Sequence, residues 1–113
     1  MCMTLYPPFL KRGITLTPWL ILIPQWARHD SAYLAHEQCH AAQQRKTGVL
    51  RFWWLYLRSD AFRLGVEVEA YKAQIAAGTP LGHCAYWLAT GYGLRLTIEK
   101  ANELLRTLDE HAG

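Results

Sequence analysis

Long hydrophobic runs and regularly spaced cysteines are both missing from this chain of 113 residues. No stretch approaches the roughly 20 apolar residues that a membrane-spanning helix needs. The N-terminus lacks the continuous apolar run and the cleavage site of a signal peptide, and Pro7 and Pro8 interrupt it. The three cysteines follow no regular spacing, which argues against a disulfide framework and favours a reducing compartment, the cytoplasm.

Strong charge, repeats and low-complexity tracts are absent as well. Charged residues make up 19% of the chain, the formal net charge is +3, and no block of five like charges occurs, so nucleic-acid binding is not predicted. The length suits one hydrophobic core. We expect an extended or irregular N-terminal segment over residues 1–12 and a single domain over residues 13–113. The five Trp and six Tyr indicate a heavily aromatic core or an exposed aromatic surface.

The most informative stretch contains the pattern His-Glu-x-x-His at His36, Glu37 and His40. Residues four apart lie on the same face of a helix, so the two histidines can present their imidazoles to one metal ion. Glu37 is about 100° round the helix from His36, beside the metal. A general base for the water that the metal activates must stand there, so the pattern predicts a zinc site. The alternative is an amphipathic helix with two solvent-facing histidines.

Helix signals surround this pattern. Asp30 and Ser31 are good N-cap residues, and Gly48 is a good C-cap after the basic Arg45 and Lys46. Before this helix, β-branched runs at 14–17 and 19–23 predict two short strands or one bent strand. After it, we expect helices over 60–77, over 83–90 and from Thr97 onward. The predicted fold is therefore α+β and mostly helical, with a small sheet before the motif helix.

Residues 49–58 are the most apolar stretch of the second half, and their structure is ambiguous. A helix would place Leu50, Trp53, Trp54 and Leu57 on one face. We expect this face to pack against the core. A peripheral membrane contact is the second interpretation, because basic residues flank the aromatic ones, but such contacts usually need a more basic face.

A catalytic zinc site typically has three protein ligands, so a third ligand is required. The helix predicted over 60–77 offers Glu67 and Glu69. These residues point about 200° apart on a helix, so only one of them can face the metal. Helical geometry alone does not decide which of the two is the third ligand.

The combination of His36-Glu37-x-x-His40 with Glu67-x-Glu69-Ala70-Tyr71 resembles the gluzincin branch of zinc metallopeptidases, in its very small bacterial and phage-type forms. The resemblance implies a minimal zincin-like domain in which Glu67 is the third ligand. It also implies that the strand region before the motif helix lines the cleft and pairs with an extended peptide. Tyr71 stands where the family often has an Asp that orients a zinc-bound imidazole. The phenol could accept that hydrogen bond, stabilise an oxyanion, or simply belong to the core.

The expected function is therefore zinc-dependent hydrolysis of a peptide or protein substrate, with Glu37 as general base. The alternative is a non-enzymatic module that zinc stabilises and that binds a partner through an aromatic surface. Glu37 and Tyr71 are the candidate catalytic residues. His36, His40 and Glu67 are the candidate ligands, with Glu69 as the alternative to Glu67.

Overall fold

The computed structural model describes residues 3–112, with side chains for residues 3–106. The strands and the short 3-10 helix are β1 (Met3–Leu5), β2 (Ile14–Thr17), β3 (Leu20–Leu22) and η1 (Gln25–Ala27). The α-helices are α1 (Ser31–Thr47), α2 (Val49–Arg58), α3 (Asp60–Ala76), α4 (Leu81–Thr90) and α5 (Ile98–Ala112). The fold is α+β and mostly helical, as predicted.

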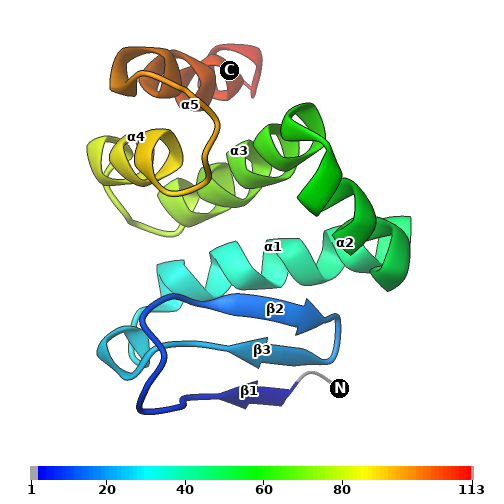
Figure 1. Cartoon of the computed structure of the whole chain (residues 1–113). Coiled ribbons are helices and arrows are strands. Elements are labelled where there is room, and N and C mark those ends of the chain that lie inside the picture. The colour runs from blue at the N-terminus through cyan, green and yellow to red at the C-terminus, as the bar shows by residue number, and fades with distance from the viewer. Residues whose placement is uncertain (1–2, 113) are drawn as a thin grey trace.

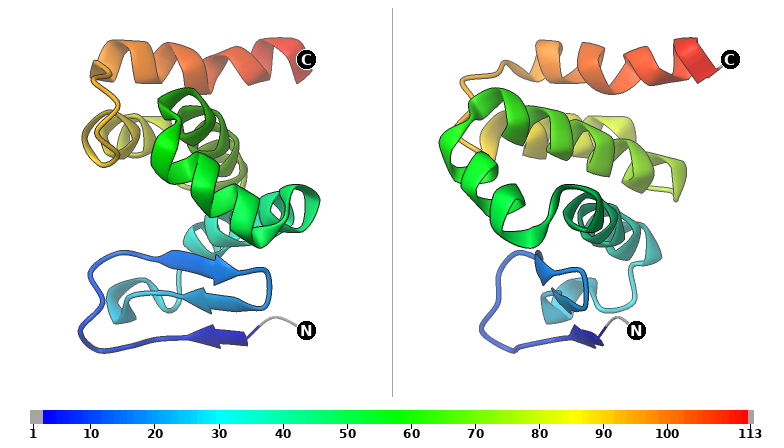
Figure 2. Two further views of the ribbon diagram at one scale, coloured as in Figure 1. Left: turned by 45° about the vertical axis from the view of Figure 1, so that its right-hand side comes forward. Right: turned by 90° about the vertical axis from the view of Figure 1, so that its right-hand side faces the viewer.

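These elements are stacked in layers (Figure 1). The sheet lies at one end, α1 runs along it beside β2, and α3 and α4 follow on the far side of α1, with α5 outermost. The turned views in Figure 2 keep the same order. The short helix α2 connects α1 to α3 at one edge of the molecule. α1 is therefore enclosed between the sheet and α3, and most of its length is shielded from solvent.

The sheet has three strands in the order β1-β3-β2. β2 and β3 are antiparallel, with a register irregularity between Thr15 and Thr17, and they occupy the two runs that the sequence predicts. β1 lies in the N-terminal segment and pairs parallel with β3. The segment over residues 1–12 thus contributes an edge strand to the sheet in addition to irregular chain.

Helix α1 begins and ends where its capping residues predict. The Asp30 side chain accepts hydrogen bonds from the amides of Ala32 and Tyr33, which satisfies two donors of the first turn. At the other end, Gly48 has φ = 94°, a conformation that glycine adopts without strain. These caps place His36, Glu37 and His40 in the middle of a regular helix. No helix among residues 3–112 is both long enough and apolar enough to cross a bilayer.

Two hydrophobic clusters lie on either side of α1. One is formed by α3, α4 and α5 and contains Tyr71, Cys84, Ala85, Leu88, Ala101 and Leu105. The smaller one lies between the sheet and α1 and contains Ile21, Ile23 and Ala27, with Tyr6, Tyr33 and Leu34 packed against it. The polar motif residues of α1 lie between the two clusters.

The apolar stripe predicted on residues 49–58 is not covered as expected. The segment is helical, but Leu50, Trp54 and Leu57 are 89%, 60% and 72% exposed. Phe52 is the buried side chain of α2, and Trp53 is half-buried. The core-packing expectation is therefore wrong for three of the four predicted residues. The physical reason is that α2 contacts α1 and α3 through the face that carries Phe52, which leaves the stripe without a partner.

Candidate metal centre

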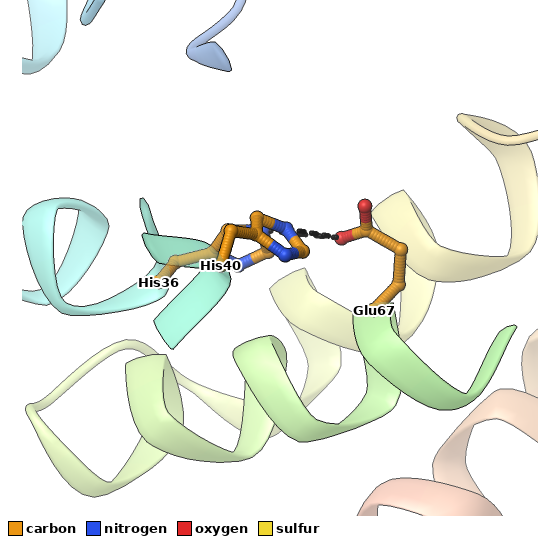
Figure 3. Close-up of side chains that lie close together, drawn as sticks. All are labelled: His36, His40 and Glu67. Carbon is orange, nitrogen blue, oxygen red and sulfur yellow. Dashed lines mark hydrogen bonds and ion pairs between the residues drawn. The ribbon is translucent and has the colours of Figure 1, made fainter. Parts of the chain in front are cut away.

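The structure brings two histidines of α1 and one glutamate of α3 together (Figure 3). The Nε2 atoms of His36 and His40 each lie 3.2 Å from the same Oε1 atom of Glu67. All three side chains are buried, and their potential ligand atoms lie within 4.8 Å of one another. Among the described residues, this group has three members. Two imidazole nitrogens and a carboxylate oxygen could hold a metal ion, and this donor set suits zinc.

The charges of this group attract one another. Burial lowers the pKa of His40. The hydrogen bond with Glu67 and the charges of Glu67 and Glu37 have the larger, opposite effect and raise this pKa to about 9. Burial raises the pKa of Glu67, and the hydrogen bonds with His36 and His40 outweigh it, so this pKa lies well below its usual range. At neutral pH the metal-free chain thus contains a buried ion pair. A metal ion would have to displace the His40 proton.

Gln43 fixes the orientation of His40. Its Oε1 atom lies 2.7 Å from Nδ1 of His40, so the imidazole donates from Nδ1 and turns Nε2 toward Glu67. Gln43 is itself held, because its Nε2 donates to the carbonyl of Val66 at 3.0 Å and to Glu69 at 3.1 Å. Gln43 is buried and braces α1 against α3 at the metal centre.

The second carboxylate oxygen of Glu67 accepts a hydrogen bond from Tyr56. The phenol of this α2 residue donates to Oε2 of Glu67 at 2.5 Å, and the pKa of Tyr56 is raised, first by burial and then by the charge of Glu67. Oε1 is the atom that faces the histidines. Glu67 therefore offers a single oxygen to a metal ion. Sequence reasoning did not identify Tyr56, since nothing in the spacing relates an α2 residue to a carboxylate on α3.

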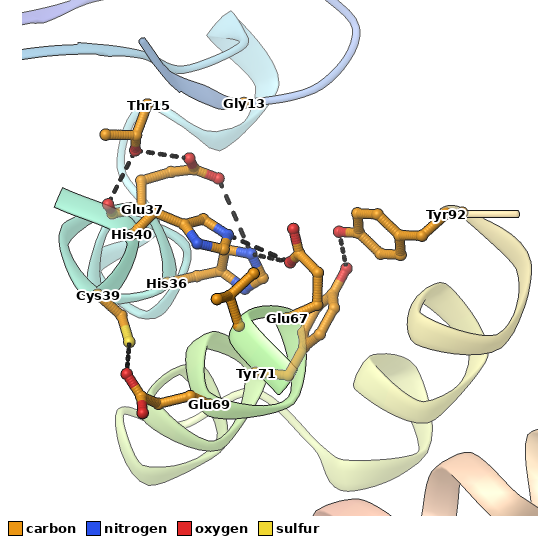
Figure 4. Close-up of polar contacts among 12 residues, drawn as sticks. Gly13, Thr15, His36, Glu37, Cys39, His40, Glu67, Glu69, Tyr71 and Tyr92 are labelled. Atoms are coloured by element: carbon orange, nitrogen blue, oxygen red, sulfur yellow. Dashed lines mark hydrogen bonds and ion pairs between the residues drawn. The ribbon is translucent and has the colours of Figure 1, made fainter. Parts of the chain in front are cut away.

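Glu37 lies beside the group and is attached to the sheet (Figure 4). Its Oε1 lies 2.9 Å from the hydroxyl of Thr15, which also lies 2.8 Å from the main-chain carbonyl of Glu37. Its Oε2 lies 4.0 Å from Nε2 of His36. A Cβ atom at Gly13 would come within 3.1 Å of Oε2 of Glu37 and within 2.6 Å of the Tyr33 ring. The position next to β2 therefore needs a glycine to leave room for the carboxylate.

The alternative third ligand, Glu69, lies away from the histidines. It is exposed, and its Oε1 accepts hydrogen bonds from Gln43 and, at 3.6 Å, from the thiol of Cys39. Burial and the Glu69 charge raise the pKa of Cys39 to about 12, so its thiol stays protonated. The structure thus places Glu67, and not Glu69 or Cys39, with the two histidines.

Tyr71 belongs both to the core and to the wall of the site. Its ring packs edge-on against His36, with 4.3 Å between ring centroids, and its hydroxyl lies 2.7 Å from that of Tyr92. Burial is the main cause that raises the pKa of both phenols. Nδ1 of His36 is buried without a hydrogen-bond partner among the described residues. In the metal-free chain, Tyr71 therefore contacts this imidazole through its ring, while its hydroxyl pairs with Tyr92.

A cleft with a volume of about 920 Å³ opens onto these groups. It is lined by residues 10–15 before and within β2, by Trp26 of η1, by residues of α1, α2, α3 and α4, and by the loop that follows α4. Lys11, Arg12 and Arg63 contribute cationic side chains to the lining. Arg12 donates to the carbonyl of Gly91 at 3.0 Å and lies over the Tyr92 ring. A chain segment could thus reach the metal centre from solvent.

The role of Gln43 can be tested by its replacement with leucine. We expect Gln43→Leu to weaken zinc binding by about 10- to 100-fold, because Nδ1 of His40 loses its acceptor and the ring its fixed orientation. Competition with a chromophoric chelator measures this affinity. Gln38→Leu is the matched control, since Gln38 is an exposed residue of the same helix. Equal affinities of the two variants would contradict the orienting role.

Comparisons with known proteins add no relative to these observations. No family model, no curated protein and no solved structure matches the chain. The group of His36, His40 and Glu67 is therefore the principal basis on which a function can be argued.

Proposed function

We propose that the protein is a zinc-dependent peptidase of the zincin type. One observation carries the proposal: two buried imidazoles and a carboxylate converge on one point, with a further carboxylate, Glu37, beside them at the cleft. A structural zinc site usually has four protein ligands, whereas a catalytic site has three and keeps one position open. The three-membered group, in which Glu67 has one oxygen available, favours a catalytic site.

Zinc at this centre would polarise a peptide carbonyl and lower the pKa of water. The chain's own residues would manage the protons and the charge. Glu37 would take a proton from the attacking water and pass it to the leaving amine, while the Thr15 hydroxyl keeps the carboxylate in position. The raised pKa of Tyr71 keeps its phenol protonated, so it could donate a hydrogen bond to the oxyanion once its pairing with Tyr92 is exchanged.

An extended peptide is the substrate form that this cleft favours. β2 is an edge strand, and residues 13–15 lie in the cleft next to Glu37. The carbonyls of Thr15 and Leu16 already accept hydrogen bonds from Gln44 and Trp53. The Gly13 amide likewise already donates to the Tyr33 hydroxyl at 2.7 Å, so strand addition would involve the start of β2 near Ile14 and not the whole strand. The free thiols of Cys39 and Cys84 support a cytoplasmic location as part of this proposal.

The first experiment is the zinc-to-protein ratio of the purified chain, measured by elemental mass spectrometry after loosely bound metal has been removed. We expect a ratio near one. A ratio near zero that persists after incubation with zinc would remove the basis of the proposal. With zinc present, a peptide library then tests hydrolysis.

The second candidate function is a zinc-stabilised binding module without catalysis. The exposed stripe of Leu50, Trp54 and Leu57 favours it, since a surface of this kind marks an interaction site. This candidate also predicts a zinc ratio near one, but no cleavage of any peptide in the library.

A further inference from the structure

The exposed side chains of α2 form one continuous apolar ridge. Leu50, Trp54 and Leu57 follow the i, i+4, i+7 spacing and therefore fall within an arc of about 60° on the helix. With exposed fractions of 89%, 60% and 72%, none of the three is covered by the part of the chain that the structure describes. We call these three residues the α2 ridge. The helix lies at the edge of the molecule, where it connects α1 to α3 (Figure 1), and the exposed fractions show that the ridge faces solvent.

Positive charge borders the α2 ridge. Arg51 and Arg58 are exposed and lie about 80° to 100° from Leu50 on the helix, next to the Trp54 side of the ridge. The Arg58 guanidinium lies over the Trp54 ring, 4.4 Å from its centroid. Arg45 and Lys46 are exposed in the last turn of α1. Residues 38–59 include these four cations and no acidic residue.

We propose that the α2 ridge docks on an anionic lipid surface. An apolar ridge on a short helix, with tryptophan beside arginine, matches a helix that lies in the plane of a bilayer interface. The leucines would enter the boundary between headgroups and acyl chains, and the indole would sit at headgroup level. The four cations, with no acidic residue among them, complement the negative lipids of a cytoplasmic leaflet. The charge pattern favours lipid over a second copy of this basic chain.

The position of the ridge relates it to the cleft. Leu57 belongs to the α2 ridge and also lines the cleft. Trp53, which lies one turn earlier on α2, lines the cleft as well. Docking would therefore bring the cleft entrance to the lipid surface. Lipid binding itself requires neither zinc nor Glu37, so the docking proposal and the proposed peptidase function can fail independently.

Cosedimentation with lipid vesicles tests the proposal on the full chain. The probe is a vesicle of equal parts phosphatidylserine and phosphatidylcholine, compared with one of phosphatidylcholine alone. We expect the wild type to bind the anionic vesicles. The double variant Leu50→Ala, Trp54→Ala should partition at least about tenfold more weakly. Arg51→Gln with Arg58→Gln should bind about 25-fold more weakly, since each surface cation contributes about fivefold.

Tyr86→Ala is the matched control. Tyr86 is 53% exposed, belongs to α4 and does not line the cleft, and Figure 1 shows α4 on the opposite side of the molecule from α2. This variant should bind the vesicles as the wild type does. Circular dichroism should give equal melting temperatures for the ridge, arginine and control variants, because none of the side chains replaced in them is buried. Glu37→Gln should also leave vesicle binding unchanged.

Three results would overturn the proposal. The first is a wild type that does not sediment with anionic vesicles. The second is equal binding by the wild type and the ridge variants. The third is a wild type that is dimeric by light scattering and ignores vesicles, while the Leu50→Ala, Trp54→Ala variant is monomeric, because the ridge would then be a contact between two copies of the chain.

Discussion

Replacement of Glu37 by glutamine should lower kcat/KM for a cleavable peptide by about a thousandfold, the effect typical of the loss of a general base. Glutamine has nearly the same shape and can still accept the hydrogen bond of Thr15, but it cannot take a proton from water. Zinc content should stay near one per chain, because Glu37 does not belong to the ligand group. Steady-state kinetics together with elemental analysis measure both quantities on the same sample.

Glu69→Gln supplies the matched control for this chemical change. Glu69 is exposed and lies outside the ligand group, and the amide oxygen of glutamine can still accept the hydrogen bond from Gln43, so this replacement should leave kcat/KM within about twofold of the wild type. Cleavage by Glu37→Gln at the wild-type rate would refute the proposed role of the carboxylate. Loss of zinc from this variant would instead show that Glu37 holds the metal.

The second large effect is expected at Glu67. Glu67→Gln should weaken zinc binding by more than about a hundredfold, because replacing even an outer partner of a ligand costs 10- to 100-fold. The amide keeps the size of the carboxylate and can still accept a hydrogen bond from Tyr56, but it removes the charge that faces His36 and His40. The dialysed variant should contain almost no zinc and should show no peptidase activity.

Glu69→Gln again separates the two possible ligands. If Glu69 were the third ligand, the zinc content of Glu69→Gln would fall and that of Glu67→Gln would not. Circular dichroism of each metal-free variant shows whether the fold survives. The thermal midpoint of Glu67→Gln at neutral pH should fall, because the variant loses the buried ion pair between Glu67 and His40, and burial then lowers the pKa of His40.

The motif helix was predictable because its determinants are local. Asp30 and Gly48 define its ends through short-range hydrogen bonding and backbone conformation, and the four-residue spacing alone puts His36 and His40 on one face. The choice of Glu67 over Glu69 was not local. It needed the family resemblance, because the rotation of α3 about its axis depends on packing against α1.

The outer partners of the site could not be predicted for the same reason. Gln43 could face either solvent or α3, and only the packing of α1 against α3 decides between them. Tyr56 reaches Glu67 because α2 packs against both α1 and α3. Gly13 is confined by Tyr33 and Glu37, which are distant from it in sequence. Periodicity on α2 identified an apolar face correctly. Periodicity could not predict that Leu50 and Trp54 stay exposed, since it carries no information about which element packs against the apolar face.

Tyr56 connects the short helix α2 to the candidate metal centre through a hydrogen bond to Glu67. The same rigid helix carries the exposed Leu50 and Trp54 and holds one oxygen of Glu67 through the Tyr56 phenol. Any contact that shifts α2 would therefore change the basicity and the position of a metal-binding carboxylate. Thermodynamic reciprocity then requires that metal binding change the affinity of that contact by the same factor. Ten residues would thus suffice for an allosteric link between the outer surface of the molecule and its buried centre.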